Sequence, residues 1–117
     1  MSPAPRFGRM RDGARPAPGG EAFAELAALG TARVERIASL GHAGAWCDQH
    51  WPEFVLLVSG AAVLEFADGA ERRLEPGDWV LLPPRCRHRV AWTEPERETL
   101  WLAVHGAAAP GAPGAPG

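Results

Sequence analysis

The sequence contains no lysine, only two cysteines and no apolar run long enough to cross a membrane as a helix. Two cysteines cannot build the disulfide framework of a small secreted protein, and the N-terminus lacks the apolar stretch of a secretory signal. We therefore expect a cytoplasmic protein with no membrane partner. The chain also lacks a Ser-His-Asp order, a P-loop and a GxGxxG motif, so these patterns predict no catalytic residue.

The charge is spread unevenly along the chain. Residues 1–19 carry four arginines and one aspartate, a net charge of +3, whereas the remainder carries eight arginines and thirteen acidic residues, a net charge of −5. An acidic body opposes binding to the phosphates of nucleic acids, because that binding needs a cationic surface. We therefore expect no nucleic-acid partner, and we interpret the basic N-terminal segment as a solvated extension.

The composition predicts one folded domain between two tails. The chain has 117 residues, enough for one domain with its own core. Residues 1–20 are rich in Pro, Gly and Arg, and residues 106–117 consist entirely of Ala, Pro and Gly. Both segments are predicted to be disordered because they cannot bury an apolar face. The folded domain is expected over residues 21–105.

The beginning of the folded domain has the composition of a helix. Within Glu21–Leu29 the apolar residues Phe23, Leu26 and Ala27 lie at positions i, i+3 and i+4, and Gly30 follows as a natural stop. This pattern predicts one short amphipathic helix.

The segments after Gly30 have the pattern of short strands. Apolar or alternating runs occupy residues 32–40, 54–58, 61–67, 72–74, 79–82, 87–92 and 99–105, and Asp68-Gly69 and Pro76-Gly77 are turn signals. Seven or eight strands of this kind indicate an all-β sandwich or barrel. An immunoglobulin-like fold lacks its Cys…Trp…Cys framework here, and a lipocalin-like fold needs a longer chain of regular hairpins.

Two segments roughly thirty residues apart carry the candidate site. The first runs from Trp46 to Gly60 and contains Asp48-Gln49 and Glu53; the second runs from Gly77-Asp78 through Pro83 to His88. Together they resemble the two motifs of the cupin superfamily, most closely those of small single-domain cupins (cupin 2 type) in which D-Q-x3-E replaces the H-x-H of motif 1. The resemblance implies that residues 21–105 form a cupin domain, a double-stranded β-helix or jelly-roll barrel, with the short helix packed outside.

The alternation of side chains along a strand predicts which motif residues face the barrel interior. Residues two apart share a face, so Gln49 and Glu53 lie together in the first segment, and His88 shares its face with Trp92 in the second. We therefore expect a pocket for a small molecule lined by Gln49, Glu53, His88 and Trp92. Trp51 is expected to extend the aromatic wall. The remaining second-motif residues divide between the interior (Cys86, Val90) and solvent (Arg85, Arg87, Arg89).

The resemblance also implies a metal site with an incomplete set of ligands. In cupins that bind a metal, two histidines and a glutamate of motif 1 and one histidine of motif 2 hold it. By position, Cys47 and Gln49 replace the two histidines, whereas Glu53 and His88 match the other ligands. A divalent metal (Zn²⁺, Fe²⁺ or Mn²⁺) would then be held by Glu53 and His88, with Gln49 as a weak oxygen donor. Adjacent His50 could contribute only if the strand were bulged.

A second interpretation needs no metal, because a Glu and a His inside a barrel can bond each other and nearby backbone. The two cysteines, Cys47 and Cys86, are expected to be half-buried reduced thiols. His42 and His105 lie near strand ends and receive no role.

Three functions remain open from the sequence. The first is a small-molecule-binding cupin with a degenerate metal site. The second is a metal-dependent cupin enzyme of the oxygenase, isomerase or lyase type, and the third is an interaction module without a ligand. Because Phe54–Val58 and Trp79–Leu82 are apolar on both faces, we also expect a homodimer with one of these strands near its interface.

Overall fold

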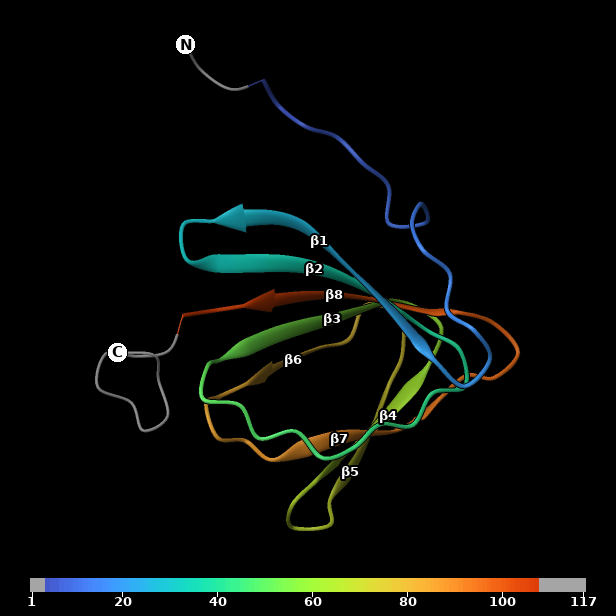
Figure 1. Cartoon of the computed structure of the whole chain (residues 1–117). Coiled ribbons are helices and arrows are strands. Elements are labelled where there is room, and N and C mark those ends of the chain that lie inside the picture. Colours follow the sequence, from blue (N-terminus) through green and yellow to red (C-terminus); the bar gives the residue numbers. More distant parts are fainter. Residues whose placement is uncertain (1–3, 108–117) are drawn as a thin grey trace.

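The computed structural model describes residues 4–107, which fold into two facing antiparallel sheets (Figure 1). One sheet has the strand order β1-β2-β8-β3-β6 and the other the order β5-β4-β7. The strands are β1 (Glu21–Leu29), β2 (Ala32–Ser39), β3 (Glu53–Ser59), β4 (Ala62–Phe66), β5 (Glu71–Leu74), β6 (Trp79–Leu82), β7 (His88–Thr93) and β8 (Thr99–His105). The predicted all-β jelly roll is confirmed. Within residues 4–107 no helix is long and apolar enough to cross a membrane.

The predicted N-terminal helix is wrong, because Glu21–Leu29 forms the edge strand β1. This strand pairs with β2 from Glu21↔Ser39 to Leu29↔Ala32, with a bulge between Glu25 and Ala27. Gly30, read as a helix stop, instead occupies the tight turn of this hairpin with φ = 61°. Helix propensity is a weak preference of a few tenths of a kcal/mol per residue, roughly, and pairing with a neighbouring strand overrides it.

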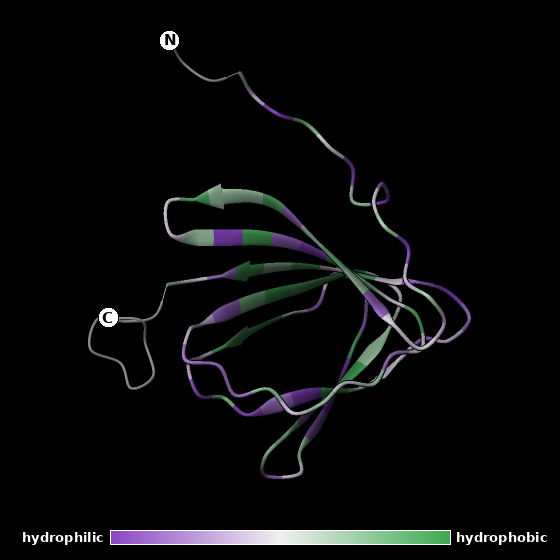
Figure 2. Cartoon of the chain, in the orientation of Figure 1, coloured by the Kyte–Doolittle hydropathy of each residue, from purple (hydrophilic) through white to green (hydrophobic). Residues whose placement is uncertain are grey.

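The hydrophobic core lies between the two sheets. In the larger sheet Val55 and Leu57 of β3 pair with Ala103 and Trp101 of β8, and all four side chains are buried. Figure 2 shows hydrophobic stretches in β3, β6 and β8, which are neighbours in this sheet. The smaller sheet contributes Leu64 to the same cluster. This packing fixes the inward face of each strand, and therefore the direction in which the motif side chains point.

The connection between β3 and β4 depends on a glycine. Gly60 has φ = 91°, and a Cβ atom there would lie 2.4 Å from Oγ1 and 2.6 Å from Cα of Thr99. The absence of a side chain lets β8 approach this turn, where the Thr99 hydroxyl donates to the carbonyl of Ala61 at 3.2 Å. The turn thus joins the two sheets at a buried point.

The outward face of the larger sheet is apolar and partly open to solvent. Trp79 is 62% exposed and Leu81 58% exposed, and both belong to edge strand β6. Phe54 of β3 stacks on Trp79 with a centroid separation of 5.4 Å. The helix that was expected to cover part of this face does not form.

The segment before β1 contains no helix or strand over residues 4–20. Arg36, which is only 2% exposed, donates hydrogen bonds to the carbonyls of Met10 (2.7 Å) and Ala14 (3.0 Å) in this segment. Arg15 forms an ion pair with Glu98. The predicted disorder of residues 1–20 stays a prediction, and most of the predicted C-terminal tail, residues 108–117, lies outside the described residues.

Candidate functional site

His88 begins β7 and presents one ring nitrogen without a protein partner. The residue is 8% exposed, and its Nδ1 lies 2.8 Å from the carbonyl oxygen of Cys86. A carbonyl only accepts hydrogen bonds, so Nδ1 carries a proton and donates it. Backbone bonds between His88 and Cys47, at 2.7 and 3.0 Å, hold the start of β7 against the first motif. A neutral His88 therefore directs the lone pair of Nε2 away from its own backbone.

Glu53 begins β3 and is held by the first motif. Its side chain is buried, and its Oε1 accepts a 2.8 Å hydrogen bond from Nε2 of Gln49. Gln49 lies in the loop four residues before Glu53, and this loop folds back so that the Gln49 amide reaches the Glu53 carboxylate. One of the two N–H donors of the Gln49 amide thus holds the carboxylate of Glu53 in place.

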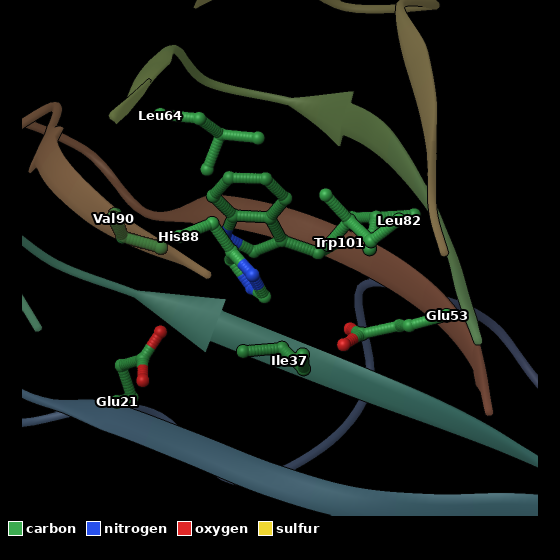
Figure 3. A pocket seen from close by; sticks show the side chains of 9 residues that line it. Glu21, Ile37, Glu53, Leu64, Leu82, His88, Val90 and Trp101 are labelled. Atoms are coloured by element: carbon green, nitrogen blue, oxygen red, sulfur yellow. The ribbon is translucent and has the colours of Figure 1, made fainter. Parts of the chain in front are cut away.

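A cavity between the sheets brings Glu53 and His88 together. Water-sized molecules can enter about 60 Å³ of it, and the lining residues are Glu21, Ile37, Glu53, Val55, Leu64, Leu82, His88, Val90 and Trp101. Figure 3 shows His88 beside Trp101, with the carboxylates of Glu21 and Glu53 on either side. Two of the four residues expected to line a pocket, Glu53 and His88, are among these lining residues. Gln49 stands behind Glu53 and is not among the lining residues.

Glu21 is the charged residue of the cavity that the sequence analysis did not predict. Its Oε2 accepts a 2.9 Å hydrogen bond from Ser39, which itself accepts a 3.1 Å bond from the indole N–H of Trp101. Its Oε1 lies 3.1 Å from Nε2 of His42. Predicting a helix over residues 21–29 hid Glu21, and only a strand paired to Ser39 would have pointed to it.

Comparison with known families agrees with this geometry. A model of the cupin domain matches residues 41–105, more than half of the chain. The chain belongs to the cupin family. The matched region contains both motifs and every strand from β3 to β8.

Solved cupin structures show the same fold. A protein of Ralstonia eutropha JMP134, named as a candidate mannose-6-phosphate isomerase, is 40% identical; the match covers 90% of this chain and 100% of that chain, with a TM-score of 0.80. A cupin 2 conserved barrel domain protein of Salinispora arenicola CNS-205 is 26% identical over 77% of this chain and 78% of that chain, with a TM-score of 0.63.

More distant similarity shows the fold alone. The polyketide cyclase RemF of Streptomyces resistomycificus is 17% identical, with 87% of this chain and 78% of that chain covered and a TM-score of 0.73. No curated protein matches the chain.

Trp92 does not line the cavity of this cupin. The pairing of β4 with β7 shifts between Val63 and Leu64, so Leu64 faces Val90 whereas Val63 faces Trp92. This bulge reverses the alternation and turns Trp92 to the outer surface, where the guanidinium of Arg73 lies 5.3 Å from its ring centroid. The expectation that Trp92 shares the inward face of His88 is wrong for this reason. Buried Trp101 supplies the aromatic wall instead.

Trp51, which was expected to extend the aromatic wall, is not among the residues that line the cavity and instead orients His105. Its indole N–H donates to Nδ1 of His105 at 2.9 Å, and Nε2 of His105 lies 3.0 Å from Oε1 of Glu35. His50 packs edge-on against Trp51 and does not line the cavity. His105, for which no role was predicted, thus links the first motif to β2.

The two cysteines occupy different environments. Cys86 is half-buried and packs against the core, as expected, whereas Cys47 is exposed and free. Desolvation raises the pKa of the Cys47 thiol, and the negative charges of Glu53 and Glu21 raise it further. The thiol therefore favours its neutral form and is a poor metal ligand or nucleophile near neutral pH.

The three arginines of the second motif, Arg85, Arg87 and Arg89, all lie outside the cavity, as expected. Arg87 and Arg89 place their guanidinium carbons 4.8 and 5.3 Å from the ring centroid of Trp46. Arg89 also pairs with Glu65 at 2.6 Å. The positive charges of Arg87 and Arg89 therefore interact with an aromatic ring and a carboxylate outside the cavity, and not with a ligand inside it.

The donor set fits an exchangeable metal and no tightly held one. Within residues 4–107 no group of three or more His, Cys, Asp or Glu side chains is arranged to hold a metal ion. The tautomer of His88 suits metal ligation, since ligating histidines donate their other ring N–H to a backbone or carboxylate oxygen. Glu53 adds one carboxylate, whereas catalytic zinc sites generally have three protein ligands.

Proposed function

We propose that this cupin binds a small polar organic molecule in its barrel cavity through Glu53 and His88, with Gln49 positioning the Glu53 carboxylate. The observation that carries the proposal is the state of His88. Its side chain is buried, its Nδ1 is used by the carbonyl of Cys86, and no hydrogen bond satisfies its Nε2. No side-chain nitrogen or oxygen of residues 4–107 is both fully buried and without a partner, so this Nε2 is accessible from the cavity and can accept a hydrogen bond from a ligand or a water molecule there.

The size of the cavity limits the ligand. About 60 Å³ holds several water molecules, and one water needs roughly 10–15 Å³ measured in this way. The enclosed part of the ligand therefore has on the order of four or five non-hydrogen atoms. The apolar side chains of Leu64, Leu82 and Trp101 surround this space and leave orientation to the few polar groups.

A thermal-shift screen of small polar compounds tests the proposal. We expect at least one compound to raise the unfolding temperature of the wild-type chain, and His88→Ala to abolish this response. His50→Ala is the matched control because it removes a neighbouring imidazole outside the cavity. If His88→Ala responds to the same compounds as the wild type, the cavity is not the binding site.

A second candidate function is a metal-dependent cupin enzyme. The tautomer of His88 favours it, and Glu53, His88 and Gln49 would hold the ion. Bound metal would supply Lewis-acid chemistry at the cavity. The relative named as a candidate mannose-6-phosphate isomerase makes isomerisation the reaction class to test first.

Metal analysis after dialysis separates the two candidates. Two firm ligands predict an exchangeable ion, so we expect Zn²⁺, Fe²⁺ or Mn²⁺ to bind reversibly and to be lost on dialysis against buffer. Binding should also weaken at acidic pH, because the ligands must be deprotonated. His88→Ala should abolish binding, whereas Cys86→Ser should leave it unchanged. Stable retention of one equivalent per chain would favour the enzyme over the simple binding protein.

A further inference from the structure

We infer that Glu21 is a second ligand-binding carboxylate and that the cavity selects a compact organic cation, such as a small ammonium compound, over an anion. The inference rests on the proposed function because it concerns the same cavity, and it adds the chemical class of the ligand. Glu21 lies in β1, outside the region that the cupin model matches, and outside both motifs.

The side-chain hydrogen-bond donors of the residues that line the cavity, Trp101 and His88, are already used within the protein. The indole N–H of Trp101 is bonded to Ser39, and the hydroxyl of Ser39 to Glu21. The amide of Gln49 is bonded to Glu53, and Nδ1–H of His88 to a backbone carbonyl. No arginine of residues 4–107 lines the cavity. What the walls offer to a ligand is therefore a set of acceptors.

Three acceptors remain, and they lie on different sides of the cavity. Each carboxylate oxygen has two lone-pair directions, so Glu21 can accept from a ligand after accepting from Ser39 and His42. Glu53 has the same capacity beside Gln49, and His88 offers Nε2 between the two carboxylates (Figure 3). His42, when protonated, balances part of the charge of Glu21. Among residues 4–107, the one cationic group within salt-bridge distance of Glu53 is His105, when that residue is protonated.

This arrangement matches a molecule with two hydrogen-bond donors at opposite ends. A primary ammonium group has three donors and a positive charge, and a hydroxyl two carbon atoms away supplies another donor. An anion would enter a space bounded by two carboxylates without any free donor to receive it, which is unfavourable at low dielectric. A phosphate or carboxylate group is therefore predicted to stay outside the inner cavity.

Three probes of nearly equal size test the charge preference. Ethanolamine is a cation, ethylene glycol is neutral, and glycolate is an anion, and each carries a hydroxyl. The full chain, treated with a chelator and dialysed, is titrated with each probe at constant ionic strength and neutral pH. The readout is the indole N–H signal of Trp101 in the NMR spectrum, identified by its loss in Trp101→Phe, because this group is linked to Glu21 through Ser39.

We expect ethanolamine to shift this signal saturably, ethylene glycol to bind more weakly, and glycolate to act no differently from added salt. Glu21→Gln should weaken ethanolamine binding about tenfold, as expected for loss of a charged hydrogen bond. Glu71→Gln is the matched control, since Glu71 is exposed on β5 and does not line the cavity. If Glu21→Gln fails to fold, Glu21→Asp, which keeps the charge and withdraws it by one methylene, should also weaken binding relative to the wild type.

The outcomes separate this inference from the proposed function. Equal binding of ethanolamine by Glu21→Gln and Glu71→Gln, or tighter binding of glycolate than of ethanolamine, would overturn the inference. So would a wild-type chain that responds to none of the three probes. In each case the proposed function stands if the thermal-shift screen finds a ligand that depends on His88, and it fails if no such ligand is found.

Discussion

His88 and His105 are held in opposite tautomers on neighbouring parts of the barrel. The proton of His88 lies on Nδ1, which donates to the carbonyl of Cys86 at 2.8 Å. In His105 the indole of Trp51, which can only donate, occupies Nδ1 at 2.9 Å, so the proton lies on Nε2 and is donated to Glu35 at 3.0 Å. One imidazole thus offers Nε2 to the cavity, whereas the other offers its lone pair to a tryptophan.

The tautomers are the first prediction. At a pH where both rings are neutral, long-range ¹H–¹⁵N spectra should show a protonated Nδ1 in His88 and a protonated Nε2 in His105. Trp51→Phe removes the donor that fixes His105, so the ring nitrogens of His105 should shift while those of His88 stay unchanged. A protonated Nδ1 in His105 of the wild type would contradict the geometry around Trp51.

The second prediction concerns the Cys47 thiol, whose raised pKa reports the cavity carboxylates. Desolvation is the main cause, followed by the charges of Glu53 and then Glu21. In a Cys86→Ser background, Cys47 should therefore react with iodoacetamide at pH 8 more slowly in the folded chain than in urea. Glu53→Gln should speed the reaction of the folded chain, and Glu21→Gln should speed it less.

The sign of the linked effect on stability follows from the same shift. The folded state holds the Cys47 thiol proton more tightly than the unfolded state does. The contribution of this proton to the free energy of unfolding is therefore present at lower pH and is lost as the pH rises through the raised pKa. Glu71→Gln should leave the reaction rate unchanged because Glu71 is not among the causes of the shift. Alkylation of folded Cys47 as fast as in urea would contradict the raised pKa.

The third prediction compares two glycines with nearly the same backbone conformation. Gly60 has φ = 91° and Gly69 has φ = 88°, but an added Cβ meets Thr99 at Gly60 and nothing within 4 Å at Gly69. Gly69→Ala should lower the free energy of unfolding by about 1–2 kcal/mol, the cost of strain alone. Gly60→Ala should cost about 3 kcal/mol or more, because β8 must also move. Urea unfolding measures both, and equal losses would show that the contact with Thr99 is unimportant.

The strands after Gly30 follow from the sequence, and so does the inward direction of Glu53 and His88, because each depends on local alternation. Trp92 shows where alternation fails: one bulge between Val63 and Leu64 turns its ring to the outside. A bulge has no reliable signal in a single sequence, since it depends on how the partner strand is packed. The aromatic wall was therefore predicted at the wrong residue.

The sequence did not predict Glu21 as a cavity residue, and the reason is different. Its segment is rich in Ala, Leu and Glu, which favour a helix, yet it forms an edge strand on β2. The bonds that place its carboxylate come from Ser39 and His42, residues that lie 18 and 21 positions away in the chain. A contact of this kind becomes visible only when the register of the β1–β2 pair is known.

The fourth prediction is that the chain forms a homodimer through the outward face of its larger sheet. Trp79 and Leu81 are more than half exposed there, and Phe54 stacks on Trp79. The predicted helix that would have covered part of this face is strand β1. Solvent contact of such large apolar side chains is unfavourable by about 25 cal/mol per Å² of apolar surface, so a second copy placed on the same face would stabilise both chains.

Light scattering at micromolar concentration should give twice the chain mass of 12.5 kDa. Leu81→Glu places a charge at the centre of this face and should yield the monomer without loss of secondary structure. Phe23→Glu is the matched control: Phe23 is also largely exposed, at 57%, but it pairs with Ile37, a residue that lines the cavity, and so lies on the other face of the sheet. A wild-type chain with the mass of a monomer would remove this explanation of the exposed apolar face, and a dimer disrupted only by Phe23→Glu would place the interface on the hairpin of β1 and β2 instead.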